Sequence, residues 1–169
     1  TNELAEFEGF SISDVPNELE SVYISHPKNA CGFLVGMLNY VDNNGDSKHV
    51  MLICFMGTQN PDDWEINFDA AQEKVGDDRY YHQGFNKSAK HYYDALQNKS
   101  FSMGDGTKYT FSEYINKMGE GSNDYQMIIS GHSLGGAVAS IFTSYYINTL
   151  GGINVQKNTV TYTFGCPYT

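Results

Sequence analysis

The sequence predicts an α/β protein with a mixed, mostly parallel sheet and flanking helices. Three observations lead to this fold class. First, two apolar segments joined by a turn lie before the other strand-like and helix-like segments of the chain. Second, the later strand-like segments are separated by helix-like ones. Third, a glycine-rich strand-to-helix junction, "ISGHSLGG", lies at residues 129–136. The 169 residues, 1–169, fit a single domain, because they contain no internal repeat and no linker that would divide them.

The first two strands are expected to form a hairpin. Residues 31–41 ("CGFLVGMLNYV") and 48–56 ("KHVMLICFM") are apolar and rich in residues that favour strands. Between them, "DNNGD" at residues 42–46 supplies turn chemistry, and its Asn44-Gly45 pair tolerates positive φ.

Helical patterns follow the hairpin. Residues 58–75 start with Pro61 and acidic side chains, and we interpret them as an irregular loop passing into a short helix that carries Trp64, Phe68 and Ala71. Residues 82–97 predict an amphipathic helix, whose apolar face consists of Phe85, Ala89, Tyr92, Tyr93 and Leu96. A short helix is expected at residues 111–118, capped by Thr110 or Ser112.

The last third of the chain predicts a strand, a helix and a strand. Residues 125–130 ("YQMIIS") are a short apolar run and indicate a central strand. Residues 134–150 have helix length and end at Gly151-Gly152, which favours a C-terminal cap. Residues 158–165 alternate β-branched and aromatic residues, as a final strand does.

The charge of the chain narrows its partners. The formal net charge is −10, and Arg79 is the only arginine. Nucleic-acid binding is therefore not expected, because it draws its energy from clustered Lys and Arg. Strong binding to anionic membranes is disfavoured for the same reason, whereas a neutral lipid surface remains compatible with apolar side chains.

Cysteine usage and the N-terminus say little about cofactors or location. Cys31, Cys54 and Cys166 are odd in number and show no C-x-x-C spacing, so buried free thiols on strands, or one disulfide with a leftover thiol, are expected. No metal or organic cofactor is implied, and "DNNGD" lacks the full calcium-loop pattern. The chain begins at Thr1 without an apolar signal segment; location stays open, with secretion slightly favoured.

The junction at residues 129–136 has the G-x-S-x-G pattern of a nucleophile elbow, with a strand before it and a helix after it. In such a turn Ser133 is the nucleophile, and bulky side chains at Gly131 or Gly135 would collide with neighbouring elements. The backbone N–H of Leu134, at the helix N-terminus, is an expected oxyanion donor. The alternative is a glycine-rich turn used only for packing.

Four motifs in this order resemble the class 3 lipase family, which includes fungal triacylglycerol lipases and feruloyl esterases. "CFMGTQNPDDW" (54–64) is similar to the family's F-R-G-T followed by D-W, and "HQGF" (82–85) to its H-x-G-F. "GHSLGG" (131–136) resembles its serine elbow, and "TYTFGCP" (161–167) its T-F-G-x-P strand. The resemblance implies an α/β-hydrolase fold and a lipase or esterase acting on lipid or other acyl esters, hence lipid degradation.

Carried onto this sequence, the resemblance makes Ser133 the nucleophile and the Leu134 N–H one oxyanion donor. Thr58 would supply the second donor through its backbone N–H and hydroxyl; its alternative is an ordinary loop residue. Met56 stands where the family usually has arginine, so Asp62, Asp63 or another nearby acid needs a different partner. Residues 59–75, with Trp64 and Phe68, are a candidate lid or acyl contact.

The histidines are mostly expected to be structural. His82 belongs to the H-x-G-F match and is interpreted as a framework residue. His132 adjoins Ser133 but, as its neighbour in a turn, is not expected to be the general base. His26, His49 and His91 are expected on the surface or in loops.

The groups that would activate Ser133 are missing from the expected place. In α/β-hydrolases the acid and then the histidine follow the serine, yet no residue after Ser133 is Asp, Glu or His. We therefore expect the N-terminal part of a longer lipase, truncated after the strand that ends near Gly165, and inactive alone. The alternatives are a catalytically inactive binding or interaction module, and a base recruited from His26, His82 or a partner subunit.

The final strand is expected to leave an unpaired sheet edge around residues 160–164. Such an edge, with apolar side chains exposed, favours pairing with another chain. Self-association of the 169 residues is therefore expected.

Overall fold

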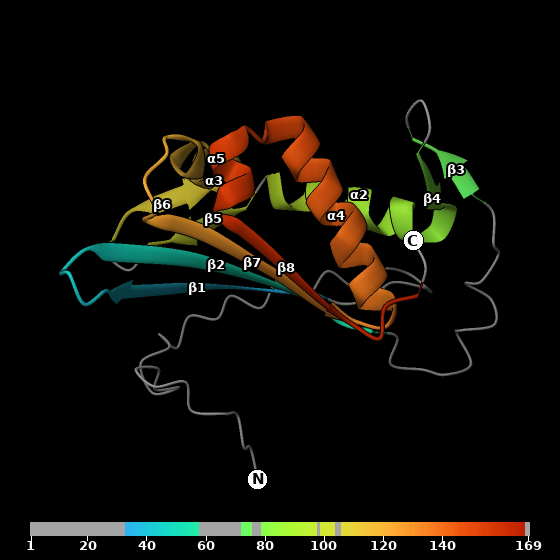
Figure 1. Ribbon diagram of the computed structural model, residues 1–169, viewed down its shortest axis with the longest axis horizontal. Coiled ribbons are helices and arrows are strands. Elements are labelled where there is room, and N and C mark those ends of the chain that lie inside the picture. The colour runs from blue at the N-terminus through green and yellow to red at the C-terminus, as the bar shows by residue number, and fades with distance from the viewer. Residues whose placement is uncertain (1–32, 58–71, 76–78, 98, 104–105, 168–169) are drawn as a thin grey trace, which may run out of the picture.

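The computed structural model describes residues 33–57, 72–75, 79–97, 99–103 and 106–167. Its centre is a four-stranded sheet with the order β1-β2-β7-β8 (Figure 1). The strands are β1 (Phe33–Val41), β2 (Ser47–Phe55), β7 (Tyr125–His132) and β8 (Thr159–Phe164). β1 is antiparallel to β2, while the β2–β7 and β7–β8 pairs are parallel. The predicted mixed, mostly parallel sheet is confirmed.

The β1–β2 hairpin closes through the predicted turn. Gly45 has φ 88°, a conformation that a glycine adopts without strain. The Asp42 carboxylate accepts hydrogen bonds from the N–H groups of Asn44, at 2.9 Å, and Asp46, at 3.0 Å. This side chain–backbone turn fixes the pairing of the hairpin, in which Phe33 lies opposite Phe55.

The described helices lie on one side of the sheet (Figure 1). They are α2 (Gln83–Gln97), α3 (Phe111–Gly119), α4 (Leu134–Leu150) and α5 (Ile153–Lys157). α4 packs against β7, β8 and β2, and α2 packs against α4. The sheet contributes Met51, Ile53, Phe55, Met127 and Ile129 to the core. On α2, the predicted apolar face is buried at Phe85, Ala89, Tyr92 and Leu96, whereas Tyr93 is half-buried.

α3 is joined to the sheet by one tyrosine. A capping box of Thr110 and Glu113 starts the helix, so the first of the two predicted caps is used. The buried Tyr114 hydroxyl accepts a hydrogen bond from the Met51 N–H at 3.1 Å and lies 2.6 Å from the Gln126 carbonyl oxygen. It therefore bridges β2 and β7, and its burial raises the pKa of Tyr114.

Several small elements were not predicted. β3 (Gln72–Lys74) pairs with β4 (Tyr80–His82), and β5 (Ser100–Ser102) pairs with β6 (Lys108–Thr110). The prediction of a short helix is wrong for Gln72–Lys74, because this exposed polar segment pairs with β4 instead. Trp64, Phe68 and Ala71, which defined that helix, lie outside the described residues.

The other face of the sheet carries exposed apolar side chains: Leu34, Leu52, Val160, Tyr162 and Phe164. Among the described residues, β8 pairs only with β7, as the predicted unpaired edge requires. Cys54 lies on the same face and is a free, exposed thiol, so the prediction of burial is wrong for it. Cys166 is free and half-buried. Cys31 lies outside the described residues. None of the described helices has the length and apolar composition needed to span a membrane.

Candidate active site

Ser133 lies at the turn between β7 and α4 with φ 54° and ψ −125°. It is the only non-glycine residue with positive φ in the part of the chain that the structure describes. Holding a serine in this sparsely populated region costs about 1–3 kcal/mol, so the surrounding structure must stabilise it. This backbone geometry, between a parallel strand and a helix, is the one that the predicted nucleophile elbow requires.

Three backbone hydrogen bonds hold Ser133 in this conformation. Its N–H donates to the Phe164 carbonyl oxygen at 2.8 Å. Its own carbonyl oxygen accepts from the N–H of Gly136 at 2.9 Å and of Ala137 at 3.3 Å, which starts α4. The end of β8 and the first turn of α4 therefore fix the serine together.

Gly131 and Gly135 are required sterically, as predicted. A Cβ atom on Gly131 would lie 2.2 Å from the Gly135 carbonyl oxygen. One on Gly135 would lie 2.2 Å from the Phe55 carbonyl oxygen. Both contacts are with backbone atoms, which cannot turn away as a side chain does. The two glycines thus allow α4 to start directly against β2 and β7.

The predicted oxyanion donors can be placed only in part. Leu134 is the first residue of α4, so its N–H has no acceptor within its own helix and lies at the positive end of the helix dipole. Thr58 lies outside the described residues. The residue before it, Gly57, is close to the serine, because a Cβ on Gly57 would lie 3.7 Å from the Ser133 Cβ.

Two histidines of the four motifs, His82 and His132, have different surroundings in the structure. His82 is half-buried, and its ring stacks on Phe85 with the ring centres 4.2 Å apart, a packing that fits a framework residue. His132 is exposed at the end of β7. The Ser133 side chain makes no capping hydrogen bond to the N–H groups of the first turn of α4.

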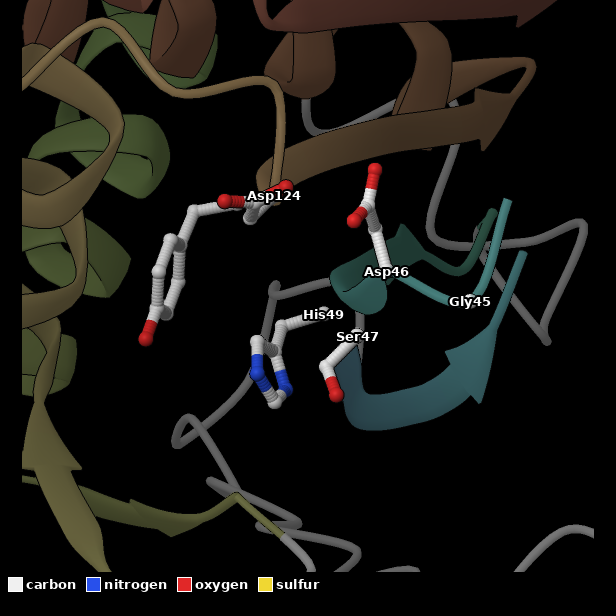
Figure 2. A pocket seen from close by; sticks show the side chains of 6 residues that line it. Gly45, Asp46, Ser47, His49 and Asp124 are labelled. Carbon is white, nitrogen blue, oxygen red and sulfur yellow. The ribbon is translucent and has the colours of Figure 1, made fainter. Parts of the chain in front are cut away.

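A polar pocket of about 420 Å³ lies at the opposite end of the sheet (Figure 2). It is lined by Gly45, Asp46, Ser47, His49, Asp124 and Tyr125. These residues lie at the starts of β2 and β7, and seven or eight residues of strand, about 25 Å, separate them from Ser133. His49, which was predicted on the surface or in a loop, lies within β2, is half-buried in the lining of this pocket and stacks on Tyr125 with ring centres 4.9 Å apart.

Charges around this pocket are already compensated. Lys48 Nζ lies 2.7 Å from Asp124 Oδ1 and 3.6 Å from Asp42 Oδ2. The hydrogen bond from Lys48 lowers the pKa of Asp124, while backbone N–H groups, chiefly that of Asp46, lower the pKa of Asp42. Among the described residues, no group of three or more His, Cys, Asp or Glu side chains is arranged to hold a metal ion.

Sequence reasoning missed two positions next to Ser133, namely Phe164 and Gly57. Phe164 acts through its carbonyl oxygen, which accepts from Ser133. Gly57 matters because it lacks a side chain beside the serine. The motifs "TFG" and "MGT" mark both positions in the sequence, but only the pairing of β2 and β8 with β7 shows what they touch.

A mixed, mostly parallel sheet with a tight turn at Ser133 leading into α4 has the arrangement of an α/β-hydrolase fold. Residues 52–169 match the sequence model of the family described as Lipase (class 3), and the chain belongs to this family. The resemblance predicted from the four motifs is thereby confirmed. A comparison with curated protein sequences finds no match.

Solved structures of fungal lipases share the fold. The lipase from Rhizopus microsporus var. chinensis is 18% identical, with a TM-score of 0.54 over 81% of this chain and 41% of that chain. The triacylglyceride lipase of Rhizomucor miehei is 17% identical, with a TM-score of 0.51 over 79% and 42%. The Rhizomucor miehei lipase propeptide complex is 20% identical, with a TM-score of 0.50 over 81% and 37%. The chain thus spans about two fifths of the lipases it matches.

Proposed function

We propose that Ser133 is the nucleophile of a carboxylic-ester hydrolase that acts on lipid or other acyl esters. The observation that carries the proposal is the left-handed backbone of Ser133, with φ 54°, at the junction of β7 and α4. Strain of this kind persists where the structure over-determines it, and it occurs preferentially at reactive residues. Family membership supports the same chemistry.

In the proposed reaction, Ser133 Oγ attacks the ester carbonyl carbon while a general base takes the hydroxyl proton. The carbonyl oxygen becomes an oxyanion, which the N–H of Leu134 and the proposed donor Thr58 stabilise. The alcohol leaves with the proton, and water then hydrolyses the acyl-enzyme by the same steps. The positive end of α4 favours the negative charge as it forms.

We propose that the general base and its acid partner come from outside residues 1–169 of the whole protein. No residue after Ser133 in this sequence is Asp, Glu or His, and the match to the Rhizopus microsporus lipase covers 81% of this chain but only 41% of that chain. Residues 1–169 alone would then be inactive, because an unactivated serine hydroxyl is a poor nucleophile at neutral pH.

The surroundings of Ser133 favour an apolar acyl group. Met56 and Phe164, at the ends of β2 and β8, are 39% and 60% exposed. Met56 replaces the family's arginine, so the end of β2 carries an apolar side chain there instead of a charge. Residues 59–75, with Trp64 and Phe68, remain the proposed lid or acyl contact. A lipid ester as substrate also agrees with the name of one relative in fold, the triacylglyceride lipase of Rhizomucor miehei.

A fluorophosphonate probe tests the nucleophile in the whole protein that contains this chain. We expect covalent labelling that maps to Ser133 and disappears in Ser133→Ala. The matched control is Ser130→Ala, which removes a hydroxyl from the end of β7 near Ser133 and should be labelled as the wild type is. Absence of labelling in the folded whole protein would contradict the proposal and favour a binding module.

We also propose that the chain of 169 residues self-associates through the outer edge of β8. Val160, Tyr162 and Phe164 are 43%, 54% and 60% exposed on this strand. Sedimentation velocity should show concentration-dependent association that Tyr162→Lys reduces. Tyr40→Lys, on the β1 edge, is the matched control. A monomer at high concentration would refute this part of the proposal.

A further inference from the structure

β8 contacts the helical layer in a different way from the other parallel strands. β2 and β7 contribute large apolar side chains to the core, such as Phe55 and Met127. In β8 the apolar side chains are exposed on the outer face, and the positions that alternate with them, 159, 161 and 163, are threonines. Among the described residues, β8 contributes no side chain to the hydrophobic core. Its side-chain contact with α4 therefore depends on polar groups.

Two hydroxyl groups join α4 to the middle of β8. Thr143 Oγ1, on α4, lies 2.9 Å from Thr161 Oγ1, on β8. Thr143 donates its hydrogen to the Ala139 carbonyl oxygen at 2.8 Å, and a hydroxyl has only one hydrogen to donate. Thr161 is therefore the donor to Thr143. Both residues are half-buried, so this bond is partly shielded from water.

A second pair of hydroxyls lies at the start of β8. Tyr146, fully buried on α4, donates from its hydroxyl to Thr159 Oγ1, and Thr159 donates to the Val155 carbonyl oxygen at 2.7 Å. Both pairs need a particular distance between donor and acceptor, whereas apolar contacts tolerate a small shift. A shift of β8 along α4 would therefore break both pairs at once.

The same helix and strand also hold the candidate nucleophile. The Ser133 N–H, at the start of α4, donates to the Phe164 carbonyl oxygen, at the end of β8, at 2.8 Å. Phe164 follows Thr161 by three residues, which is about 10 Å along a strand. A shift of β8 along α4 would therefore carry the Phe164 carbonyl oxygen away from the Ser133 N–H.

We propose that Thr143 and Thr161 are positioning residues, whose hydroxyl pair fixes β8 against α4 and thereby keeps the Phe164 carbonyl oxygen at the Ser133 N–H. This inference rests on the proposed function of Ser133. The contact requires the hydroxyl and not the shape of the side chain. Serine should therefore replace either threonine, whereas valine, which has the shape of threonine without its hydroxyl, should not.

Kinetics of ester hydrolysis by the whole protein test the pair. Thr143→Val and Thr161→Val should each lower kcat about fivefold, the effect of about one hydrogen bond, with KM changed less than about twofold. Misplacement of a nucleophile affects the transition state more than substrate binding. Thr143→Ser and Thr161→Ser should keep kcat within about twofold of the wild type. Serine variants as slow as the valine variants refute the inference.

The double variant Thr143→Val/Thr161→Val shows whether the two hydroxyls act through each other. It should be no more than about twofold slower than either single variant, because each single change already removes the shared bond. Losses that multiply in the double variant overturn the pairing. The matched control is Thr163→Val, which removes an exposed hydroxyl from the same face of β8 and should keep kcat within about twofold.

Hydrogen exchange of the Ser133 amide, measured by NMR, tests the pair without any activity. Thr143→Val and Thr161→Val should speed this exchange about fivefold, while the amides of the β1–β2 hairpin, the serine variants and Thr163→Val stay unchanged. Unchanged exchange at Ser133, or equally faster exchange in the hairpin, refutes the positioning role. If the whole protein is neither active nor labelled by the probe, yet exchange responds as stated, the proposed function fails and the positioning role stands.

Discussion

Gly135→Ala is the sharpest test of how the turn at Ser133 is built. A Cβ on Gly135 would lie 2.2 Å from the Phe55 carbonyl oxygen, 2.7 Å from the Phe55 carbonyl carbon and 2.9 Å from the Met56 carbonyl carbon. Carbon–oxygen contacts in proteins are seldom shorter than about 3.3 Å. The start of α4 and the end of β2 must then separate by about 1 Å, or the methyl group cannot be accommodated.

Two effects of opposite sign decide the magnitude. Alanine favours a helix over glycine by at most about 1 kcal/mol, which alone would stabilise the variant. Overpacking against backbone costs about 1–3 kcal/mol and occasionally more, and here the displaced segments belong to the central sheet and α4. We expect packing to win and the free energy of unfolding to fall by about 2–3 kcal/mol, which is a decrease in Tm of about 4–12 °C.

Thermal and urea denaturation of the chain measure this loss. The matched control is Gly152→Ala, because a Cβ there would meet no atom within 4 Å and φ is −99°. Gly152→Ala should leave the stability within about 0.5 kcal/mol or raise it slightly. If Gly135→Ala is as stable as the wild type, α4 can shift without cost, and the steric explanation of the G-x-S-x-G pattern in this protein is wrong.

Three further predictions follow from single side chains. Tyr114→Phe should lower the free energy of unfolding by about 1–3 kcal/mol in urea denaturation, because it leaves buried β2 and β7 backbone groups without a partner; the exposed Tyr162→Phe should change it little. Lys48→Met should raise the pKa of Asp124, which an NMR carboxyl titration measures. A carboxyl group with a lowered pKa in the folded state stabilises the fold at pH values above its ordinary pKa, and this stabilisation is lost as the pH falls through the lowered pKa. In Lys48→Met the loss of stability below about pH 4 should therefore be smaller than in the wild type. Ser133→Gly should relieve backbone strain and raise Tm by a few degrees, equivalent to about 1 kcal/mol, while Ser133→Ala should not; equal Tm values would contradict this.

The parts of the fold that the sequence predicts are those with a strong local signal. The β1–β2 hairpin follows from apolar segments around Asn44-Gly45, and α2 follows from its regular apolar face. β3 and β5 have three residues each, too few to show the alternation that identifies a strand. They form because a partner segment offers backbone hydrogen bonds, which is information from elsewhere in the chain.

In the candidate site, too, the sequence predicts the part formed by consecutive residues and misses the part contributed by distant segments. "GHSLGG" identifies Ser133 and Leu134, because the turn it encodes is formed by consecutive residues. The motif does not explain why a strained serine stays in place. That depends on the carbonyl oxygen of Phe164, from β8, and on the close approach of Gly57, after β2. Since all three strand ends meet only through the parallel pairing of β2, β7 and β8, a change at the end of β2 or β8 should alter the serine as directly as a change within the motif.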